Sequence, residues 1–362
     1  MSWVLVFIGF AFLIMIHEAG HFVAAKATGM RVERFFLFFP PKLASIRRGD
    51  TEYGIGAVPL GGYVKITGMN PDEVLAPEVA ARSYYRQPVW KRIVVIGAGP
   101  AVNIALAFVI LFVLALGATD PAQTVGEIEA GSPAARVLRP GDKILAVDGR
   151  RYLNLSQSAR LTRFIADIAH HECPGKATAG CRATTAVALR VRRDGGIRTV
   201  SARPFYDPAV QRTRIGFSYG SRPANLGVGG AAERAAGAVW MVTSRTVSVF
   251  ANIFDAKHRK EVSGVVGVSD VAHQVIGFGA RYALMLLAIV SLSLGLINLF
   301  PFLPLDGGHI FWSLVEKLRG APVSFRVMER AGAVGFVLVI MLFFIGLSND
   351  IGRLTGEGFN IR

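Results

Sequence analysis

The feature that most constrains this chain is an apolar stretch over residues 3–25, WVLVFIGFAFLIMIHEAGHFVAA. It holds no Lys, Arg or Asp, and its 23 residues are enough for a helix to cross a bilayer core of about 30 Å. It nevertheless contains His17, Glu18 and His21. Because ionisable side chains are costly to bury at that depth, the stretch predicts a transmembrane helix whose polar residues have a function.

The spacing of these polar residues indicates a zinc site. His17 and His21 are four residues apart and share one face of a helix, so that two imidazoles can bind one zinc ion. Glu18 lies beside them, within reach of an attacking water molecule. The alternative is a polar patch that joins transmembrane helices. A catalytic zinc site has three protein ligands, so a third ligand has to come from elsewhere in the chain.

Composition indicates a membrane protein with several spans. Hydrophobic residues make up 52% of the 362 residues, and charged residues make up 18%. About 160 mostly polar residues separate the second and third apolar runs, which is enough for a domain of its own. The net charge of +15 is typical of basic loops that face anionic lipid. The sequence has no nucleic-acid-binding signature, so we expect the lipid bilayer and no nucleic acid as a partner. The four apolar runs are 3–25, 93–117, 280–300 and 331–347.

Basic residues set the expected orientation. Lys26, Arg31 and Arg34 follow the first run and no basic residue precedes it, which is the reverse of a secretory signal peptide. The positive-inside rule therefore predicts that both termini lie outside the cytoplasm. The same rule assigns 26–92 and 301–330 to the cytoplasm and 118–279 to the outside.

This topology supplies a candidate for the third metal ligand. The third run ends on the cytoplasmic side and continues into PFLPLDGGHIFW (301–312), so Asp306 is expected at the depth of the histidine pair. A carboxylate and two neutral imidazoles make a catalytic zinc shell with one open position. The alternative for Asp306 is a helix cap or an ion pair within the bundle. We expect His309 to support the site rather than to bind the metal.

The first cytoplasmic loop, 26–92, holds a predicted β-hairpin. YGIGAVPLGGYVKITG (53–68) alternates in hydrophobicity and breaks at Pro-Leu-Gly-Gly, which predicts short strands joined by a Gly-rich turn. The preceding FFLFFPPKLASIRR (35–48) predicts a further strand or a turn that dips into the membrane. The hairpin is either an ordinary surface feature or a strand edge that holds an extended substrate.

The polar region contains a predicted compact α+β module over 119–205. An amphipathic helix is expected over 155–169, and a hairpin over 184–204 turns at Asp194-Gly195-Gly196. The runs S-P-A-A and L-R-P-G-D-K-I-L-A-V-D-G resemble a PDZ domain, which binds peptides or chain ends along a strand and a helix. The alternative is a small α+β domain without a ligand.

The two cysteines, Cys173 and Cys181, both lie in this module. Outside the cytoplasm they predict a disulfide. Free thiols are one alternative, and a second metal site that includes the neighbouring His170 and His171 is another.

Residues 206–279 are expected to form an extracytoplasmic linker with an amphipathic helix. Apolar residues recur at helical spacing within 235–254, but Arg245 would lie in hydrocarbon if the segment crossed the membrane. We therefore expect a helix that lies in the outer interface. The alternative, a fifth span, would reverse the orientation of everything that follows.

Together these stretches resemble the site-2 protease family, and most closely its RseP-type bacterial members. The resemblance covers nearly the whole chain. It implies an α-helical membrane protein with about four spans, divided into a membrane part over 1–118, the PDZ module, the linker and a second membrane part over 280–362. The motifs that carry it are H-E-A-G-H, Y-G-I-G-A-V-P-L-G-G-Y-V-K, G-P-A-V-N and N-L-F-P-F-L-P-L-D-G-G-H, whose L-D-G occupies 305–307.

The resemblance also implies a function. It identifies an intramembrane zinc metalloprotease of the bacterial inner membrane, with Glu18 as catalytic base and His17, His21 and Asp306 as Zn²⁺ ligands. Family substrates are single-span proteins, such as anti-sigma factors already trimmed by another protease, and signal-peptide remnants. The residues implied in substrate contact are Asn298, Asn103, Gly61, Gly62 and Tyr63.

Some features depart from the family pattern or leave another function open. There is room for one PDZ domain where well-known relatives have two, and Pro304 and Val265 differ from the usual pattern. Asn103 either joins helices or faces the zinc pocket. The alternative function is a catalytically inactive, membrane-tethered PDZ scaffold, which would have no use for the base Glu18. A zinc transporter would need more carboxylates within the spans.

Overall fold

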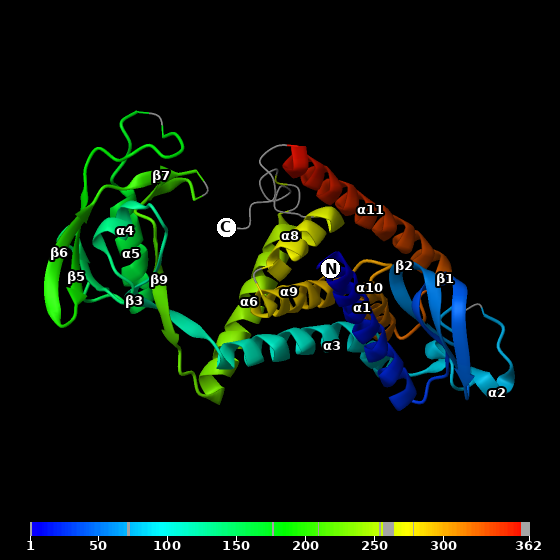
Figure 1. The fold of residues 1–362 in the computed structure, drawn as a ribbon. Coiled ribbons are helices and arrows are strands. Elements are labelled where there is room, and N and C mark those ends of the chain that lie inside the picture. The colour runs from blue at the N-terminus through cyan, green and yellow to red at the C-terminus, as the bar shows by residue number, and fades with distance from the viewer. Residues whose placement is uncertain are drawn as a thin grey trace. The chain divides into compact units, whose positions relative to one another are not determined.

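The computed structural model describes residues 2–70, 73–175, 177–208, 210–252, 255, 264–277 and 279–355. The chain divides into two compact units. The membrane unit comprises the residues up to Ala115 and those from Gly229 onward, and the inserted unit comprises Leu116–Val228. Figure 1 shows the elements of both units.

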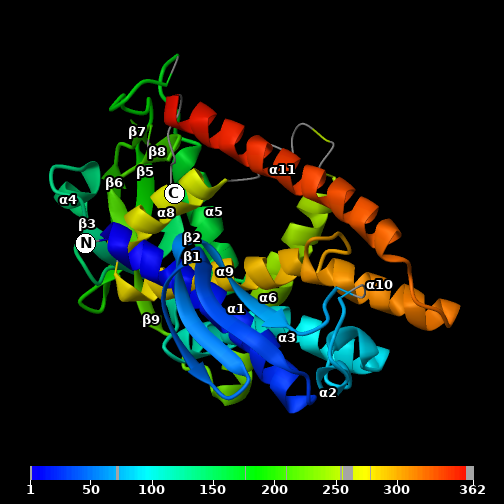
Figure 2. The same ribbon diagram turned by 90° about the vertical axis from the view of Figure 1, so that its right-hand side faces the viewer.

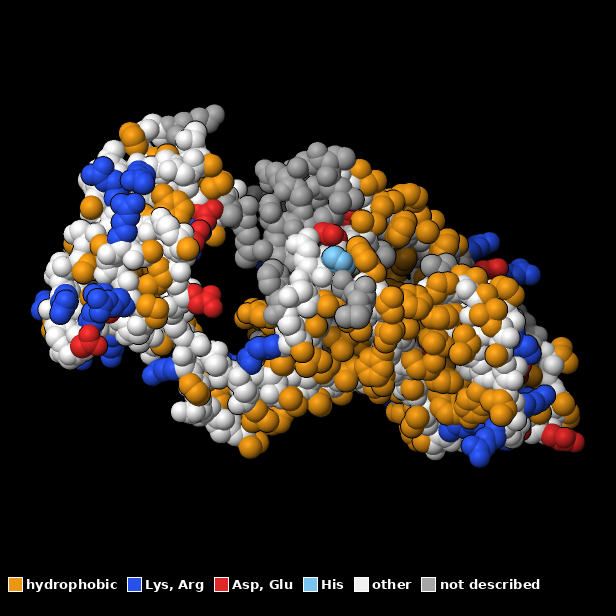
Figure 3. Space-filling model, in the orientation of Figure 1, with side chains coloured by type: hydrophobic (Ala, Val, Ile, Leu, Met, Phe, Trp, Pro, Cys, Tyr) orange, Lys and Arg blue, Asp and Glu red, His pale blue; other side chains and the backbone are white. Residues whose placement is uncertain are grey.

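Within the described residues, four helices of the membrane unit are long and apolar enough to cross a membrane. The four spans predicted from the sequence fall on these helices. Much of the visible face of this unit is covered by hydrophobic side chains, as expected for a surface in contact with lipid (Figure 3). The helices are α1 (Ser2–Ala27), α3 (Val89–Leu116), α9 (Ala280–Asn298) and α11 (Phe325–Thr355).

The other helices of this unit are shorter or less apolar. They are α2 (Pro77–Ala80), α6 (Val228–Ala251), α8 (Val265–Gly277) and α10 (Asp306–Arg319). Residues 235–251 of the segment expected in the membrane interface belong to α6, which is not one of the four candidate spans, and residues 253–254 lie outside the described residues. Ala235 of α6 packs in one cluster with Leu111 of α3 and Leu292 of α9, so small residues let this helix approach its neighbours closely.

Strands β1 (Val32–Arg48) and β2 (Thr51–Ile66) form an antiparallel pair that lies against α1 (Figure 2). The chain turns between them at Gly49-Asp50, and both strands are irregular in register. Phe36 of β1 is paired with Gly54 on one side and Tyr63 on the other, so a segment of β1 lies between the two halves of β2.

The predicted hairpin within 53–68 is therefore wrong in its pairing. In the described register the two halves of β2 pair with β1 and not with each other. The predicted Gly-rich turn was at Gly61 and Gly62. Two other glycines, earlier in β2, allow β1 and β2 to pack closely. A Cβ atom at Gly54 would lie 2.6 Å from Cζ of Phe36, and one at Gly56 would lie 2.6 Å from the carbonyl carbon of Phe39.

The inserted unit is built on a five-stranded sheet in the order β6-β5-β4-β3-β9. Helices α4 (Pro133–Val137) and α5 (Gln157–Ala169) pack with it, and Ser156 caps α5 by accepting a hydrogen bond from the backbone N–H of Ala159. The hairpin expected over 184–204 is the β5–β6 pair. The strands are β3 (Thr119–Ile128), β4 (Lys143–Val147), β5 (Val187–Arg193), β6 (Gly196–Ala202) and β9 (Phe217–Pro223), with β7 (Phe205–Asp207) and β8 (Arg212–Arg214) forming a separate pair.

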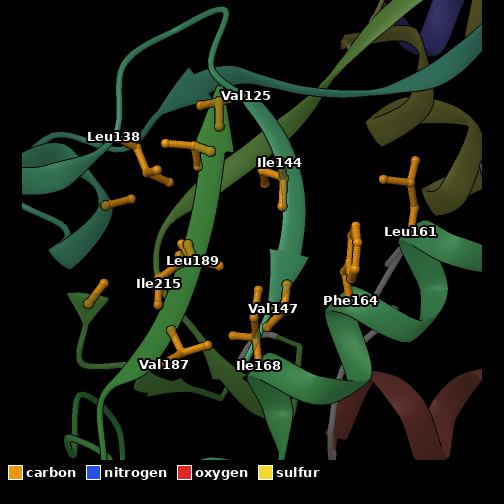
Figure 4. Close-up of a cluster of buried hydrophobic side chains, with 13 residues drawn as sticks. Val125, Leu138, Ile144, Val147, Leu161, Phe164, Ile168, Val187, Leu189 and Ile215 are labelled. Atoms are coloured by element: carbon orange, nitrogen blue, oxygen red, sulfur yellow. The ribbon is translucent and has the colours of Figure 1, made fainter. Parts of the chain in front are cut away.

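The core of this unit lies between α5 and the sheet (Figure 4). Leu161, Phe164 and Ile168 recur at helical spacing on α5 and point toward Ile144 and Leu189 of the sheet. Phe164 is fully buried. The amphipathic helix predicted over 155–169 is thus present, and it provides one side of an apolar core.

The structure corrects the prediction that a linker begins at residue 206. Residues 217–223 form β9, which pairs with β3 at the edge of the sheet, so the inserted unit continues to Val228. Phe217 and Tyr219 of β9 pack against the core. Because β9 is short and its partner lies about 100 residues earlier, no local sequence pattern indicates the pairing.

Candidate metal centre

Three side chains that are far apart in the sequence converge in the membrane unit. His17, His21 and Asp306 each offer one ligand atom, and these atoms lie within 4.8 Å of one another. Oδ2 of Asp306 is 3.1 Å from Nε2 of His17 and 3.3 Å from Nε2 of His21, and the two Nε2 atoms are 3.3 Å apart. Both histidines are buried, with 7% of their surface exposed.

The local sequence around each ligand explains this close approach. His17 and His21 are one turn apart on α1, and Asp306 is the first residue of α10. A Cβ atom at Gly20 would lie 2.6 Å from the carbonyl oxygen of Ala98, so only glycine allows α1 to pass α3 at this distance. Gly308, at the start of α10, similarly packs against the backbone at Leu303.

One hydrogen bond from His21 to a backbone carbonyl of α3 orients the imidazole. Its Nδ1 lies 2.9 Å from the carbonyl oxygen of Val95, which can only accept, so Nδ1 carries the proton. In the neutral imidazole Nε2 then bears a lone pair, and this atom faces Asp306. The α3 contact is tight, because a Cβ atom at Gly99 would overlap the imidazole ring of His21.

Asn103 holds the other histidine. Its Nδ2 lies 3.5 Å from Nδ1 of His17, while its buried Oδ1 has no hydrogen-bond partner among the described residues. Turning the amide by 180° lets Oδ1 accept a hydrogen bond from Nδ1–H of His17, which satisfies the buried oxygen. His17 then presents the lone pair of Nε2 to the same point as His21. Asn103 was expected either to join helices or to face the zinc pocket. Its position beside His17 agrees with the second interpretation.

The donor set fits a zinc ion. Two imidazole nitrogens and one carboxylate oxygen are the ligands of many catalytic zinc sites. Without a cation, two nitrogen lone pairs and a buried carboxylate oxygen would face one another and repel. Oδ2 of Asp306 is also buried without a hydrogen-bond partner. A cation bound by His17, His21 and Asp306 would remove both the repulsion between the lone pairs and the cost of burying the carboxylate oxygen unpaired.

Glu18 lies between this cluster and the β-strands. Its carboxyl group interacts with the backbone N–H of Val64. A Cβ atom at Gly62 would lie 3.0 Å from Cγ of Glu18, so glycine is needed at this approach of β2 to α1. Glu18 is therefore in contact with the strand segment that is expected to contact substrate.

The residues expected to contact substrate are not all at the cluster. Gly62 lies beside Glu18, and Tyr63 stacks on Phe36 and Phe39 with ring centroids 5.5 and 5.9 Å away. Gly61 lies against the ring of Phe39.

Asn298 is placed differently. Its amide donates to the carbonyl oxygen of Leu294 in its own helix. Among the described contacts, none joins Asn298 to the cluster.

A cleft runs along the second half of β2. Its volume is about 510 Å³, and its lining combines the strand with the turn that follows it. In the described pairings, the segment from Gly62 to Ile66 has β1 on one side only, so its other edge is open to a further strand. The lining residues are Tyr63, Val64, Lys65, Ile66, Met69, Asn70 and Glu73.

The cysteines and their neighbours lie in the inserted unit. Cys173 and Cys181 are joined by a disulfide, with their Cα atoms 6.2 Å apart. The two ring nitrogens of His171 lie 2.7 Å from Oγ1 of Thr185 and 2.7 Å from Oδ2 of Asp148. Within the part of the chain that the structure describes, no group of metal-binding side chains forms here, so the alternative of a second metal site is not supported.

Sequence reasoning missed the parts of α3 that support the ligands. Gly99 entered the sequence analysis only as the first residue of the motif G-P-A-V-N, and Val95 was not singled out. Val95 acts through its backbone carbonyl and Gly99 through its close approach to His21. Neither role can be read from the residue type. The spacing of Val95, Gly99 and Asn103 on one helical face is the signal that could have found them.

Comparisons with known proteins agree with this geometry. The model of peptidase family M50 matches residues 5–342. Zinc metalloprotease Rip1 of Mycolicibacterium smegmatis is 30% identical over 94% of this chain and 92% of its own length. Rip1 of Mycobacterium tuberculosis is 29% identical over the same shares. A Rhizobium meliloti protein named as a zinc metalloprotease is 29% identical over 95% of this chain and 94% of its own.

Proposed function

Because the chain belongs to peptidase family M50, we propose that it is a zinc metalloprotease that cleaves transmembrane segments of single-span proteins. The observation that carries the proposal is the convergence of His17, His21 and Asp306 within 4.8 Å, with Glu18 beside them. His17 and His21 lie on a helix apolar enough to cross a membrane. Relatives of this chain carry the name zinc metalloprotease, which supports zinc as its metal.

The proposed chemistry uses Glu18 as a general base. Zinc held by His17, His21 and Asp306 would supply a Lewis acid and make water more acidic. Glu18 accepts the proton of the attacking water and passes it to the nitrogen of the leaving amine. The packing of Gly62 against Cγ of Glu18 keeps this side chain beside β2. Val95 and Asn103 keep the two imidazoles in one tautomer and orientation.

We infer that the substrate is bound as an extended strand. A transmembrane helix hides its carbonyl groups in i to i−4 hydrogen bonds, so it has to unwind before cleavage. The open edge from Gly62 to Ile66 can pair with the unwound segment, since this segment of β2 lies beside both Glu18 and the 510 Å³ cleft. We therefore expect the substrates to be single-span proteins with helix-weakening residues, such as trimmed anti-sigma factors or signal-peptide remnants.

The orientation that we propose follows from the basic residues. Lys26, Arg31 and Arg34 follow α1, so the metal centre lies toward the cytoplasmic side of a bacterial inner membrane. Both termini and the inserted unit are then extracytoplasmic. An oxidising compartment is consistent with the disulfide of that unit.

We propose that the inserted unit is a PDZ domain that limits the size of a substrate's extracytoplasmic part. Its two ends are adjacent, because the backbone N–H of Ala224 donates to the carbonyl oxygen of Ala118 over 2.9 Å. Residues 119–223 can therefore be replaced by a linker of about four Gly and Ser residues. We expect this variant to cleave full-length and trimmed substrates alike, whereas the wild type cleaves the trimmed form. If the variant still rejects full-length substrate, the size-filter proposal is wrong.

The alternative function is a membrane-tethered scaffold without catalysis. A scaffold needs neither a base nor a converging donor set. The position of Glu18 beside His17, His21 and Asp306 favours the protease.

The deciding experiment is cleavage of an ectodomain-trimmed, tagged single-span substrate by purified protein in detergent. We expect the wild type to cleave, and also a control variant, Glu78→Gln, on the short helix α2. We expect cleavage to be lost in Glu18→Gln and when a zinc chelator is added to the wild type. Cleavage that persists in Glu18→Gln would contradict the mechanism. Binding of one zinc per chain without cleavage of any tested single-span substrate would favour the scaffold.

A further inference from the structure

One face of α3 supports the whole metal centre. Arg92, Val95, Gly99 and Asn103 are spaced by three, four and four residues, so they form a single stripe along the helix. Val95 accepts a hydrogen bond from His21, Gly99 lies against the ring of His21, and Asn103 lies beside His17. Three members of the stripe thus contact the two ligands on α1.

The fourth member, Arg92, contacts the helix that carries the third ligand. Its Nη1 and Nη2 donate to the two carboxylate oxygens of Glu316 over 2.9 and 2.6 Å. Only 3% of the Arg92 side chain is exposed, compared with 20% of Glu316. The ring of Tyr85 lies 5.5 Å from the guanidinium carbon of Arg92, so contacts with both Tyr85 and Glu316 fix the position and the orientation of the guanidinium group.

The geometry of α10 connects this ion pair to the metal centre. Glu316 lies ten residues after Asp306 on the same helix, or about 15 Å along its axis. The start of α10 is packed tightly, because Gly307 and Gly308 leave no room for a Cβ atom against the backbone from Leu299 to Leu303. With its start held by backbone contacts and its later part held by Arg92, α10 has a fixed rotation about its axis.

We propose that the Arg92–Glu316 pair is a positioning device for the metal centre, which locks the helix of Asp306 to the stripe of α3 that orients His17 and His21. The proposal rests on the proposed zinc site and adds residues that contact neither metal nor substrate. The two-pronged pair restricts rotation as well as distance, because two parallel hydrogen bonds define a plane. Its removal leaves a buried charge without its partner, and α10 then gains freedom to turn Asp306 away from the imidazoles.

The test is metal affinity, which does not require cleavage. Zinc binding is measured by competition with a chelator of known affinity, using full-length wild type, Arg92→Gln, Glu316→Gln and the exchanged pair R92E/E316R. We expect each single variant to bind zinc about 10- to 100-fold more weakly, the range found when groups that orient metal ligands are removed. The exchanged pair should recover most of the affinity. Lys317→Gln, which removes an exposed charge from the same turn of α10, is the matched control.

A second readout separates positioning from general stability. The absorption spectrum of bound Co²⁺ reports ligand geometry, and we expect it to change in the single variants at saturating Co²⁺ but not in Lys317→Gln. If either single variant does not fold, Arg92→Lys and Glu316→Asp keep the charges, and we expect them to bind zinc with intermediate affinity. Zinc affinity within twofold of wild type in the substituted proteins, with an unchanged Co²⁺ spectrum, would overturn the proposal. Failure of the wild type itself to bind zinc would instead refute the proposed function.

Discussion

The two units differ in the polar side chains that they bury and in the amount of large apolar surface that they expose. The membrane unit buries His17, His21, Arg92 and Asn103, while large apolar side chains such as Phe7 remain exposed. In the inserted unit the buried cluster is apolar, and it includes Phe164, Ile144 and Leu189. The difference follows from the surroundings, since lipid accepts an apolar surface and water does not.

The comparison indicates what each interior is for. Burial of polar groups stabilises a fold little, because their desolvation offsets their attraction, so they are kept where they have a function. Burial of apolar groups is the main favourable contribution to folding in water. Substitutions in the membrane interior should therefore change metal binding, whereas those in the inserted core should change stability.

The largest effect is expected at a ligand. His21→Ala removes one of three protein ligands and should lower the zinc content from about one per chain to below a tenth, with cleavage reduced to background. Zinc is measured by elemental analysis of the purified protein. Tryptophan fluorescence should stay unchanged, because the four Trp residues, at 3, 90, 240 and 312, report only on the membrane unit. Unfolding of this unit in His21→Ala would contradict the expected difference between the two units, because it would mean that His21 is needed for folding.

The next effect is expected in the apolar core. Phe164→Ala leaves a cavity in the inserted unit and should lower its free energy of unfolding by about 3–5 kcal/mol. The change is measured by hydrogen exchange of the peptides that cover β5, with Arg163→Ala on the exposed side of α5 as control. Zinc affinity is expected to stay the same. A loss of zinc binding would contradict the separation of the two units.

A smaller effect is expected where α3 meets His21. Gly99→Ala places a methyl group against the imidazole and should weaken zinc binding about 10-fold by turning the ring. Gly237→Ala is a matched control, because a Cβ atom there meets nothing within 4 Å. If Gly99→Ala binds zinc as tightly as the control, the close approach does not orient His21.

The smallest effect is expected at an ion pair of the inserted unit. Asp142 accepts two hydrogen bonds from Arg193 over 2.8 and 2.6 Å, and these lower the pKa of its carboxyl group. Asp142→Asn keeps the shape of the side chain and should cost about 1 kcal/mol of stability at pH 7. A lowered folded-state pKa stabilises the protein above the ordinary pKa of about 3.9, and this contribution is lost as the pH falls through the lowered value.

The pH dependence sharpens that prediction. The stability difference between wild type and Asp142→Asn, followed by hydrogen exchange or urea unfolding from pH 7 to 2, should shrink toward the acidic end. A constant difference over this range would mean that the charge of Asp142 does not stabilise the unit.

Local patterns predicted the spans and the close approach of His17, His21 and Asp306. Hydrophobic runs gave the four long helices, and the four-residue spacing of His17 and His21 placed both on one face. The position of Asp306 followed from topology, because alternating helices return to the same depth. These predictions needed no knowledge of how the helices pack.

Non-local contacts were not predictable in the same way. The pairing of Phe36 with both Gly54 and Tyr63 depends on how β1 inserts between the halves of β2, and β9 pairs with a strand about 100 residues earlier. The support of His21 comes from a backbone carbonyl at Val95, which any residue type would provide. Such contacts are set by tertiary packing and leave no periodic signal in the sequence.

The most direct test of the central claim, that His17, His21 and Asp306 bind one zinc ion, is X-ray absorption at the zinc edge of the purified protein. The account predicts only nitrogen and oxygen ligands at about 2.0–2.1 Å, with the scattering of two imidazoles. In Asp306→Ala, one protein ligand or the zinc itself should be lost. A sulfur ligand at about 2.3 Å, or a wild-type spectrum that is unchanged in Asp306→Ala, would contradict it.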